Sequence, residues 1–161
     1  TGIVNSEPAM TYISVRPSRY SHELISENQE FVINLTTAKT LKAADFCGVK
    51  SGRDVNKFAE TGLTPVAATT VKAPLIAESP LSLECRVTKV EHLGSHDMFL
   101  AEIVAVDVDD EYLGSELTIP VHATVSTFGL SIVPQVTITG GKGYNIVPAF
   151  HDVLAILESP L

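Results

Sequence analysis

The sequence predicts a mainly β fold of the α+β class, a β-barrel with short helices packed at its ends. Two long runs with strong β character, residues 81–93 and 98–108, are joined by a short connection that contains Gly94, a pattern typical of a hairpin. Beyond residue 116, β-branched runs are cut by Gly and Pro and add further strands. Helical spacing is confined to short stretches before residue 63. Few helices and many strands together favour a barrel.

Composition limits the classes of function. A length of 161 residues favours a single domain, residues 1–161, with a sizeable core. Although 45% of the residues are hydrophobic, there is no apolar run long enough to cross a bilayer and no secretory signal at the start. The net charge of −8, without a block of lysine and arginine, argues against nucleic acid as the main partner. We therefore expect neither a nucleic-acid nor a membrane partner.

The two cysteines indicate the redox environment. Cys47 and Cys85 lie far apart in unlike contexts, which argues against a disulfide framework and favours a reducing, cytoplasmic location. Cys85 alternates with Leu83 and Val87, so we expect it to be a small hydrophobic residue of the core.

The first clear element is a strand over residues 8–16, whose residues alternate between two faces. Pro17 breaks it, since proline cannot donate to a strand ladder. Ser18 and Ser21 follow as candidate N-caps of a helix with Glu23 in its first turn. A second strand, FVINL at 31–35, comes after that helix.

The start of this first helix has the chemistry of an anion site. A helix N-terminus offers free backbone N–H groups and the positive end of a dipole. Arg16 and Arg19 flank it, and the hydroxyls of Ser18 and Ser21 lie in the same turn. A phosphate pocket is one interpretation; an ordinary capped surface helix with two solvated arginines is the other.

The next segments predict two short helices, followed by two short strands or loops. Residues 38–48 have helical spacing, and Gly48 suits the C′ position that follows a helix. In residues 49–62, Asp54 is expected to cap a helix that Gly62 ends. GLTPV at 62–66 and VKAPLI at 71–76 are punctuated by proline and predict short strands or loops.

A family resemblance emerges when these runs are taken in order. The first part of the chain contains TGIVNSEPAMTYISVRPSRYSHELI, FVINL, DFCG, SGRDVNKF, GLTPV, APLIAESPLSLECRV and LGSHDMFLAEIVAV. This series resembles the flavin reductase-like family, specifically its flavoredoxin-type branch. The resemblance covers residues 1–113 without a long gap, whereas residues 114–161 diverge.

The resemblance implies an FMN-binding split β-barrel that forms a homodimer. It places the flavin phosphate at a first turn that comprises Arg16, Ser18, Arg19 and Ser21. It assigns a second cationic group, at the start of the helix expected in residues 49–62, to Ser51, Gly52, Arg53 and Lys57. In the family this segment reaches toward the phosphate end of the flavin. For Lys57, a solvated helix end with a basic face is the alternative.

The same resemblance assigns residues to the flavin ring. The family's S-x-P turn, which runs alongside the ring mostly through backbone contacts, matches Asn5, Ser6 and Pro8. A further ring and ribityl contact matches the end of the strand at 31–35, namely Asn34, Leu35, Thr36 and Thr37.

His96 is the candidate catalytic residue. It matches the histidine of the family's G-D-H turn, which lies near the flavin and the nicotinamide site. Ser95 replaces the usual aspartate, and the acid stands at Asp97 instead, which leaves the orienting partner of His96 open. A metal pair formed by His92 and His96 is disfavoured, because Gly94 interrupts any helix and no carboxylate or cysteine cluster completes a shell. We expect no metal site.

The resemblance predicts an FMN-dependent oxidoreductase of the flavin reductase type. Such a protein takes hydride from NADH or NADPH onto the flavin and passes electrons to free flavin, iron or a protein acceptor. The alternative is a non-enzymatic FMN electron-transfer protein similar to a flavoredoxin. A degenerate split barrel that serves only as a dimeric interaction module is a third hypothesis.

The last part of the chain suggests a reordered domain. The family's first strand–turn–strand unit is missing before Thr1, yet residues 135–150 have that shape, and residues 127–131 resemble the family's usual C-terminal ending. A circular permutant would place residues 132–150 in a hairpin whose second strand shares the barrel with residues 9–16 and brings residues 145–150 near the flavin. The start of a second copy, an imperfectly assigned sequence and an unrelated tail remain alternatives.

Overall fold

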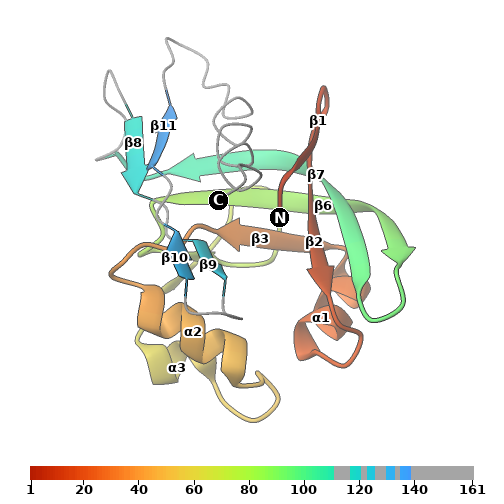
Figure 1. Ribbon diagram of the computed structural model, residues 1–161, viewed down its shortest axis with the longest axis horizontal. Coiled ribbons are helices and arrows are strands. Elements are labelled where there is room, and N and C mark those ends of the chain that lie inside the picture. Colours follow the sequence, from red (N-terminus) through yellow and green to blue (C-terminus); the bar gives the residue numbers. More distant parts are fainter. Residues whose placement is uncertain (111–116, 121–122, 126–129, 133–134, 139–161) are drawn as a thin grey trace.

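The fold is built around one antiparallel sheet. The structure, a computed structural model, describes residues 1–110, 117–120, 123–125, 130–132 and 135–138, with side chains up to residue 110. Five strands form the sheet in the order β1-β2-β7-β6-β3, and the two longest, β6 and β7, sweep across the molecule (Figure 1). These strands are β1 (Ile3–Ser6), β2 (Ala9–Val15), β3 (Glu30–Asn34), β6 (Leu81–His92) and β7 (Asp97–Val108).

Short elements surround this sheet. The helices are α1 (Tyr20–Asn28), α2 (Leu41–Val49) and α3 (Lys57–Thr61). Two-stranded pairs are formed by β4 (Pro65–Val66) with β5 (Leu75–Ile76), β8 (Leu117–Pro120) with β11 (Gln135–Ile138), and β9 (Ala123–Val125) with β10 (Leu130–Ile132). The expectation of a mainly β fold with few short helices is confirmed. Within the described residues the sheet does not close on itself.

The long hairpin at the centre is confirmed. β6 and β7 pair antiparallel from Leu81↔Val108 to His92↔Asp97. In the connecting turn the Leu93 amide donates to the His96 carbonyl oxygen at 3.0 Å, and Gly94 has a φ of +91°. That left-handed conformation strains any residue with a Cβ, which explains the glycine.

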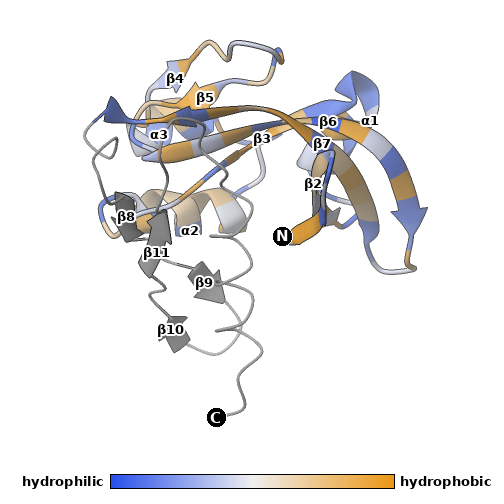
Figure 2. Ribbon diagram, turned by 90° about the horizontal axis from the view of Figure 1, so that it is seen from above, coloured by the Kyte–Doolittle hydropathy of each residue, from blue (hydrophilic) through white to orange (hydrophobic). Residues whose placement is uncertain are grey.

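One face of the sheet carries the core. Hydrophobic and hydrophilic bands alternate along β6 and β7 (Figure 2), as the period of two requires. The buried cluster consists of Phe31, Leu81, Leu83, Cys85, Phe99 and Ala101. Cys85 is completely buried, as expected, and both cysteines are free thiols. Helix α1 packs against this cluster through Ile25.

On the opposite face of the sheet, the carboxylate of Glu84 in β6 binds the loop at residues 69–71. Glu84 accepts hydrogen bonds from the amides of Thr69, Thr70 and Val71 at 2.6–3.0 Å and from the Thr69 hydroxyl at 2.8 Å. Burial alone would raise its pKa, but these bonds outweigh it and lower the pKa to about 2. The sheet therefore fixes this loop with an ionised, fully buried side chain.

Three expectations about helix ends are wrong. Neither Ser18 nor Ser21 caps α1, because Arg19 is the N-cap and its side chain makes no capping bond. Asn56 rather than Asp54 caps α3, since its side chain is the one that reaches the Ala59 amide, at 3.2 Å. Gly48 lies inside α2, which continues to Val49 and ends on extended Lys50. By contrast, Gly62 ends α3 in the left-handed conformation, as predicted.

The permutation hypothesis stays a prediction. Residues 135–138 form a strand, and its antiparallel partner in the described residues is β8. The proposed second strand of the hairpin and the residues expected near the flavin, 145–150, lie outside the described residues.

Of the described helices, none has both the length and the apolar character needed to span a membrane.

Candidate functional site

The first turn of α1 is open to solvent. The Arg19 amide donates to the Arg16 carbonyl at 2.9 Å, and the His22 amide donates to the Arg19 carbonyl at 3.0 Å. These bonds turn the chain from the end of β2 into the helix. Arg16, Ser18, Arg19 and Ser21 are all exposed. Since no side chain caps the helix at Arg19, its positive end is available to an anion.

A second segment lies against this turn. The Arg53 guanidinium stacks on the Tyr20 ring, 4.9 Å from its centroid, and pairs with Glu23. It also lies 3.5 Å from the Ser18 carbonyl oxygen, to which it donates. Gly52 faces the same ring so closely that a Cβ there would come within 3.2 Å of Tyr20 Cδ1. Residues 51–53 are thereby joined to the start of α1, more than 30 residues earlier in the chain.

The two segments enclose a cationic cavity. It has a volume of about 230 Å³ and is lined by Val15, Arg19, Tyr20, Ser21, Cys47, Gly48, Lys50, Ser51, Gly52 and Lys57. Three of these side chains are cations and none is an acid. Lys57 is held in the wall by a 2.6 Å bond from its ammonium group to the Cys47 carbonyl. Clustered cations of this kind favour an anionic ligand.

A larger open cavity of about 550 Å³ adjoins the first and shares Tyr20, Ser21, Gly52 and Lys57 with it. Arg53 and Asp54 line this second space. The structure thus brings Arg19, Ser21, Ser51 and Lys57 together around one cavity, and Arg53 lines the adjoining one. Sequence reasoning included Gly52 in the second group and missed Tyr20, the ring that Gly52 approaches closely.

The residues assigned to the flavin ring lie elsewhere. Asn5, Ser6 and Pro8 occupy the exposed β1–β2 turn, where the Asn5 side chain donates to the Pro8 carbonyl at 3.0 Å. That turn is separated from the first turn of α1 by the seven residues of β2, about 20 Å.

The second ring segment follows the end of β3. Asn34 Oδ1 accepts bonds from the Ile76 amide at 2.9 Å and the Ser82 hydroxyl at 2.8 Å, so this oxygen holds the 64–79 segment. The Leu35 amide donates to the Leu81 carbonyl at 2.9 Å. Thr36 and Thr37 precede α2, whose other end reaches the cationic cavity about 13 Å away.

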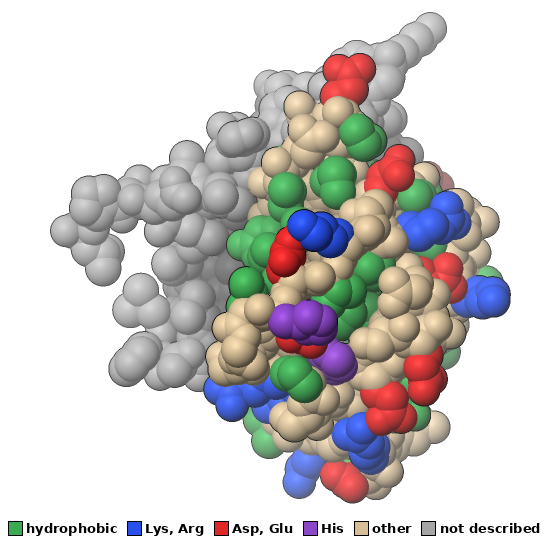
Figure 3. Space-filling model, turned by 90° about the vertical axis from the view of Figure 1, so that its right-hand side faces the viewer, with side chains coloured by type: hydrophobic (Ala, Val, Ile, Leu, Met, Phe, Trp, Pro, Cys, Tyr) green, Lys and Arg blue, Asp and Glu red, His purple; other side chains and the backbone are tan. Residues whose placement is uncertain are grey.

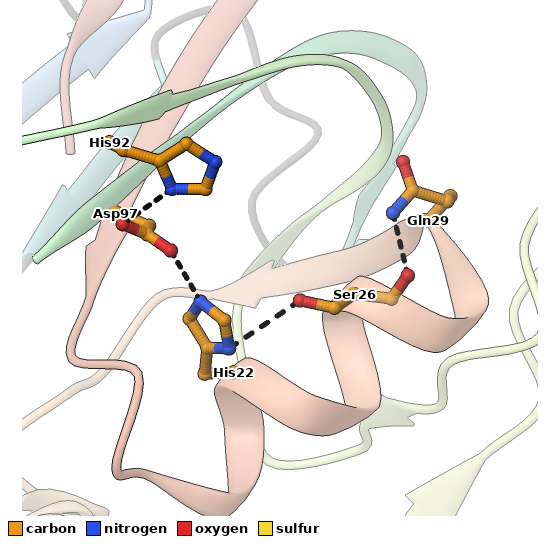
Figure 4. Close-up of polar contacts among 5 residues, drawn as sticks. All are labelled: His22, Ser26, Gln29, His92 and Asp97. Atoms are coloured by element: carbon orange, nitrogen blue, oxygen red, sulfur yellow. Dashed lines mark hydrogen bonds and ion pairs between the residues drawn. The ribbon is translucent and has the colours of Figure 1, made fainter.

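His96 lies in the β6–β7 turn, where its Nδ1 is 3.0 Å from the Ser95 hydroxyl. The acid displaced to position 97 does not serve His96. One carboxylate oxygen of Asp97 lies 2.8 Å from His22 Nε2 and the other lies 2.9 Å from His92 Nδ1 (Figure 4). Histidine side chains lie next to an acidic side chain on the face of the molecule shown in Figure 3. These two hydrogen bonds lower the pKa of Asp97.

Sequence reasoning missed this carboxylate with two histidines. His22 and Asp97 are 75 residues apart, so no local spacing links them. In the described part of the chain, no group of three His, Cys, Asp or Glu side chains has an arrangement that could hold a metal ion.

A protein family and several curated relatives match this chain. The model of the family described as flavin reductase like domain matches residues 2–123. An uncharacterized protein of Archaeoglobus fulgidus is 38% identical over 105 residues, which cover 65% of this chain and 59% of the relative. The chain spans about half to three fifths of the length of the curated relatives it matches.

Two solved structures are also similar. The flavoredoxin of Desulfovibrio vulgaris (Miyazaki F) superimposes with a TM-score of 0.69 and 29% identity, covering 88% of this chain and 77% of that one. The flavoredoxin of Methanosarcina acetivorans gives 0.68 and 27%, with coverages of 87% and 75%.

Proposed function

The chain belongs to the flavin reductase-like family, and we propose that it binds FMN and acts as an FMN-dependent oxidoreductase. It would take electrons from NADH or NADPH and deliver them to free flavin, iron or a protein acceptor. One observation carries the proposal. The two segments that the family pattern assigns to the flavin phosphate, 30 residues apart in sequence, form one cationic cavity at the uncapped start of α1.

The donor set of this cavity fits a phosphomonoester. Arg19, Lys50 and Lys57 supply positive charge, and the Ser21 and Ser51 hydroxyls can donate hydrogen bonds. Arg53 is already paired with Glu23 and stacked on Tyr20. It lines the adjoining cavity and adds its positive charge next to the proposed phosphate site. Arg16 and Ser18, just outside the cavity lining, complete the proposed phosphate turn.

FMN, when bound, supplies reversible hydride and electron transfer, and the protein supplies binding and orientation. We assign the ring-facing contacts to the β1–β2 turn with Asn5, Ser6 and Pro8, and to the end of β3 with Asn34, Leu35, Thr36 and Thr37. His96, on the β6–β7 turn, is the proposed catalytic residue near the nicotinamide. A second copy of the chain is the proposed partner, in a homodimer.

The proposed setting is the cytoplasm, because two free thiols suit a reducing compartment. A specific observation favours a second function: both solved structures described above are named flavoredoxins. The alternative is therefore an FMN electron-transfer protein that does not accept hydride from a nicotinamide.

Two measurements test these functions in turn. The purified protein, loaded with FMN and desalted, should retain the visible absorption of a flavin; a colourless protein that does not quench FMN fluorescence would contradict both. Under anaerobic conditions, NADH or NADPH should then bleach that absorption. Retention of the flavin without bleaching by either nicotinamide would leave the electron-transfer protein as the function.

A further inference from the structure

We propose that Asp97 is a positioning residue for the anion cavity: it fixes the first turn of α1 against the start of β7. The inference rests on the proposed function, because the cavity it organises is the proposed phosphate site. The starting observation is that α1 lies on the surface of the fold. None of its nine residues is fully buried, and its N-cap makes no side-chain bond.

His22 is the residue that ties α1 to the β6–β7 hairpin by a polar contact, beside Ile25 on the core and the contacts of Tyr20 and Glu23 with Arg53. Its Nε2 lies 2.8 Å from Asp97 Oδ2, and its ring meets the fully buried Phe99 edge-on, with centroids 5.2 Å apart. An ionised carboxylate can only accept hydrogen bonds, so His22 donates to Asp97 from Nε2. The other ring nitrogen, Nδ1, faces Ser26 Oγ at 3.5 Å (Figure 4). The ring is therefore fixed in place, with Nε2 facing Asp97 and Nδ1 facing Ser26.

Asp97 is itself held rigidly. It is 6% exposed, and its second oxygen accepts a hydrogen bond from His92 Nδ1 at 2.9 Å. In the sheet it stands opposite Val15 of β2 and His92 of β6, at the point where all three strands meet. A carboxylate bound on both oxygens makes a fixed point for α1.

Both neighbours of this fixed point reach the cationic cavity. Val15, the sheet partner of Asp97, lines the cavity, and Ser21, which precedes His22, lines it as well. Asp97 thus sets the distance between the end of β2 and the first turn of α1. Those are two of the walls against which the proposed phosphate would lie.

The test compares FMN with riboflavin, which has the same ring and no phosphate. Dissociation constants of both are measured by fluorescence quenching for the full chain and for the Asp97→Asn and His22→Gln variants. We expect both variants to reduce the preference for FMN over riboflavin by about fivefold or more, because the phosphate donors move while the ring contacts stay. Glu91→Gln is the matched control: it removes a carboxylate of the same hairpin that pairs with Lys89 and leaves the preference unchanged.

The outcomes separate the two proposals. If the unmodified protein binds flavin without preferring FMN, the phosphate site itself is wrong, and this inference falls with it. If it prefers FMN and both folded variants keep that preference, the phosphate site stands and the role of Asp97 is refuted. An equal loss of FMN and riboflavin binding would indicate general damage and would also refute it. Should Asp97→Asn not fold, His22→Gln, which keeps Asp97 and its bond to His92, decides alone.

Discussion

His22 Nε2 and Asp97 Oδ2 lie 2.8 Å apart although 75 residues separate the two side chains in the chain. The bond joins the first helix to the β6–β7 hairpin at the edge of the cationic cavity. The sequence left the partner of His96 open, because the acid of the turn stands at position 97. In the structure Asp97 binds His22 and His92, whereas His96 contacts the Ser95 hydroxyl. The carboxylate at position 97 thereby orients His22 and His92.

The phosphate assignment predicts the effect of two substitutions made together. Arg19→Ala with Ser21→Ala should weaken FMN binding more than tenfold, because hydrogen bonds to a charged group contribute about 1.5–3 kcal/mol each. Both side chains line the cavity and are exposed, so folding should be unaffected. Lys42→Ala, an exposed cation on α2, is the control. An unchanged dissociation constant in a fluorescence titration would reject the assignment.

His96 should act on electron transfer and not on flavin binding. We expect His96→Ala to slow the anaerobic reduction of bound flavin by NADH or NADPH about tenfold or more, with FMN affinity within about twofold of the original. Ser95→Ala, which removes the hydroxyl 3.0 Å from its ring, should give a smaller effect in the same direction. Stopped-flow absorbance measures both; a normal rate in His96→Ala excludes the residue from catalysis.

Glu84 should make the stability of the fold depend on pH. Its folded pKa of about 2 lies below the ordinary 4.5, so the carboxylate stabilises the fold at neutral pH. That contribution, about 3 kcal/mol, should be lost as the pH falls from about 5 to about 2. Denaturation of Glu84→Gln should show this deficit at pH 7 and a much smaller one near pH 2.5. A deficit that does not change with pH would mean that the charge is not responsible.

The features that could be predicted from sequence are those with local periodicity. The strand at 9–15, the long hairpin and the role of Gly62 each depend on residues close in the chain. Helix starts were predicted less well, because several polar residues compete to cap and only the turn geometry selects one. At α3 the side chain of Asn56, and not that of Asp54, caps the helix by accepting from the Ala59 amide. At α1 the N-cap is Arg19, and neither Ser18 nor Ser21 takes that position.

Buried polar residues were the least predictable part. Glu84 alternates with core residues and would be expected to face solvent, yet the loop at 69–71 covers it completely. The cationic cavity was anticipated from the family resemblance, which directs both cationic groups to the phosphate end of the flavin. The close approach of Gly52 to the Tyr20 ring required the tertiary structure.

Self-association is predicted from the family and from the described sheet. β1 stands at one edge of that sheet, and its Val4 is 48% exposed. Open sheet edges with exposed apolar residues favour association. Light scattering with excess FMN should give the mass of a dimer, about twice 17.2 kDa; the mass of a monomer would count decisively against it.

The two cysteines offer a test of the phosphate site that does not depend on activity. Burial, aided by the neighbouring charge of Glu84, raises the pKa of Cys85 to about 12, so at pH 8 this thiol should resist iodoacetamide in the native protein. Cys47 is half-buried and lines the cationic cavity, so it should be the thiol that reacts.

FMN should then protect Cys47, slowing its alkylation by about fivefold or more, whereas riboflavin at equal saturation should protect it much less. Mass spectrometry of the labelled peptides distinguishes the two thiols, and Cys47→Ser removes the reaction as a control. Equal protection by FMN and riboflavin would mean that the phosphate does not lie in this cavity. Protection by inorganic phosphate alone, competing with FMN, would locate the anion there, because that ion shares nothing else with the flavin.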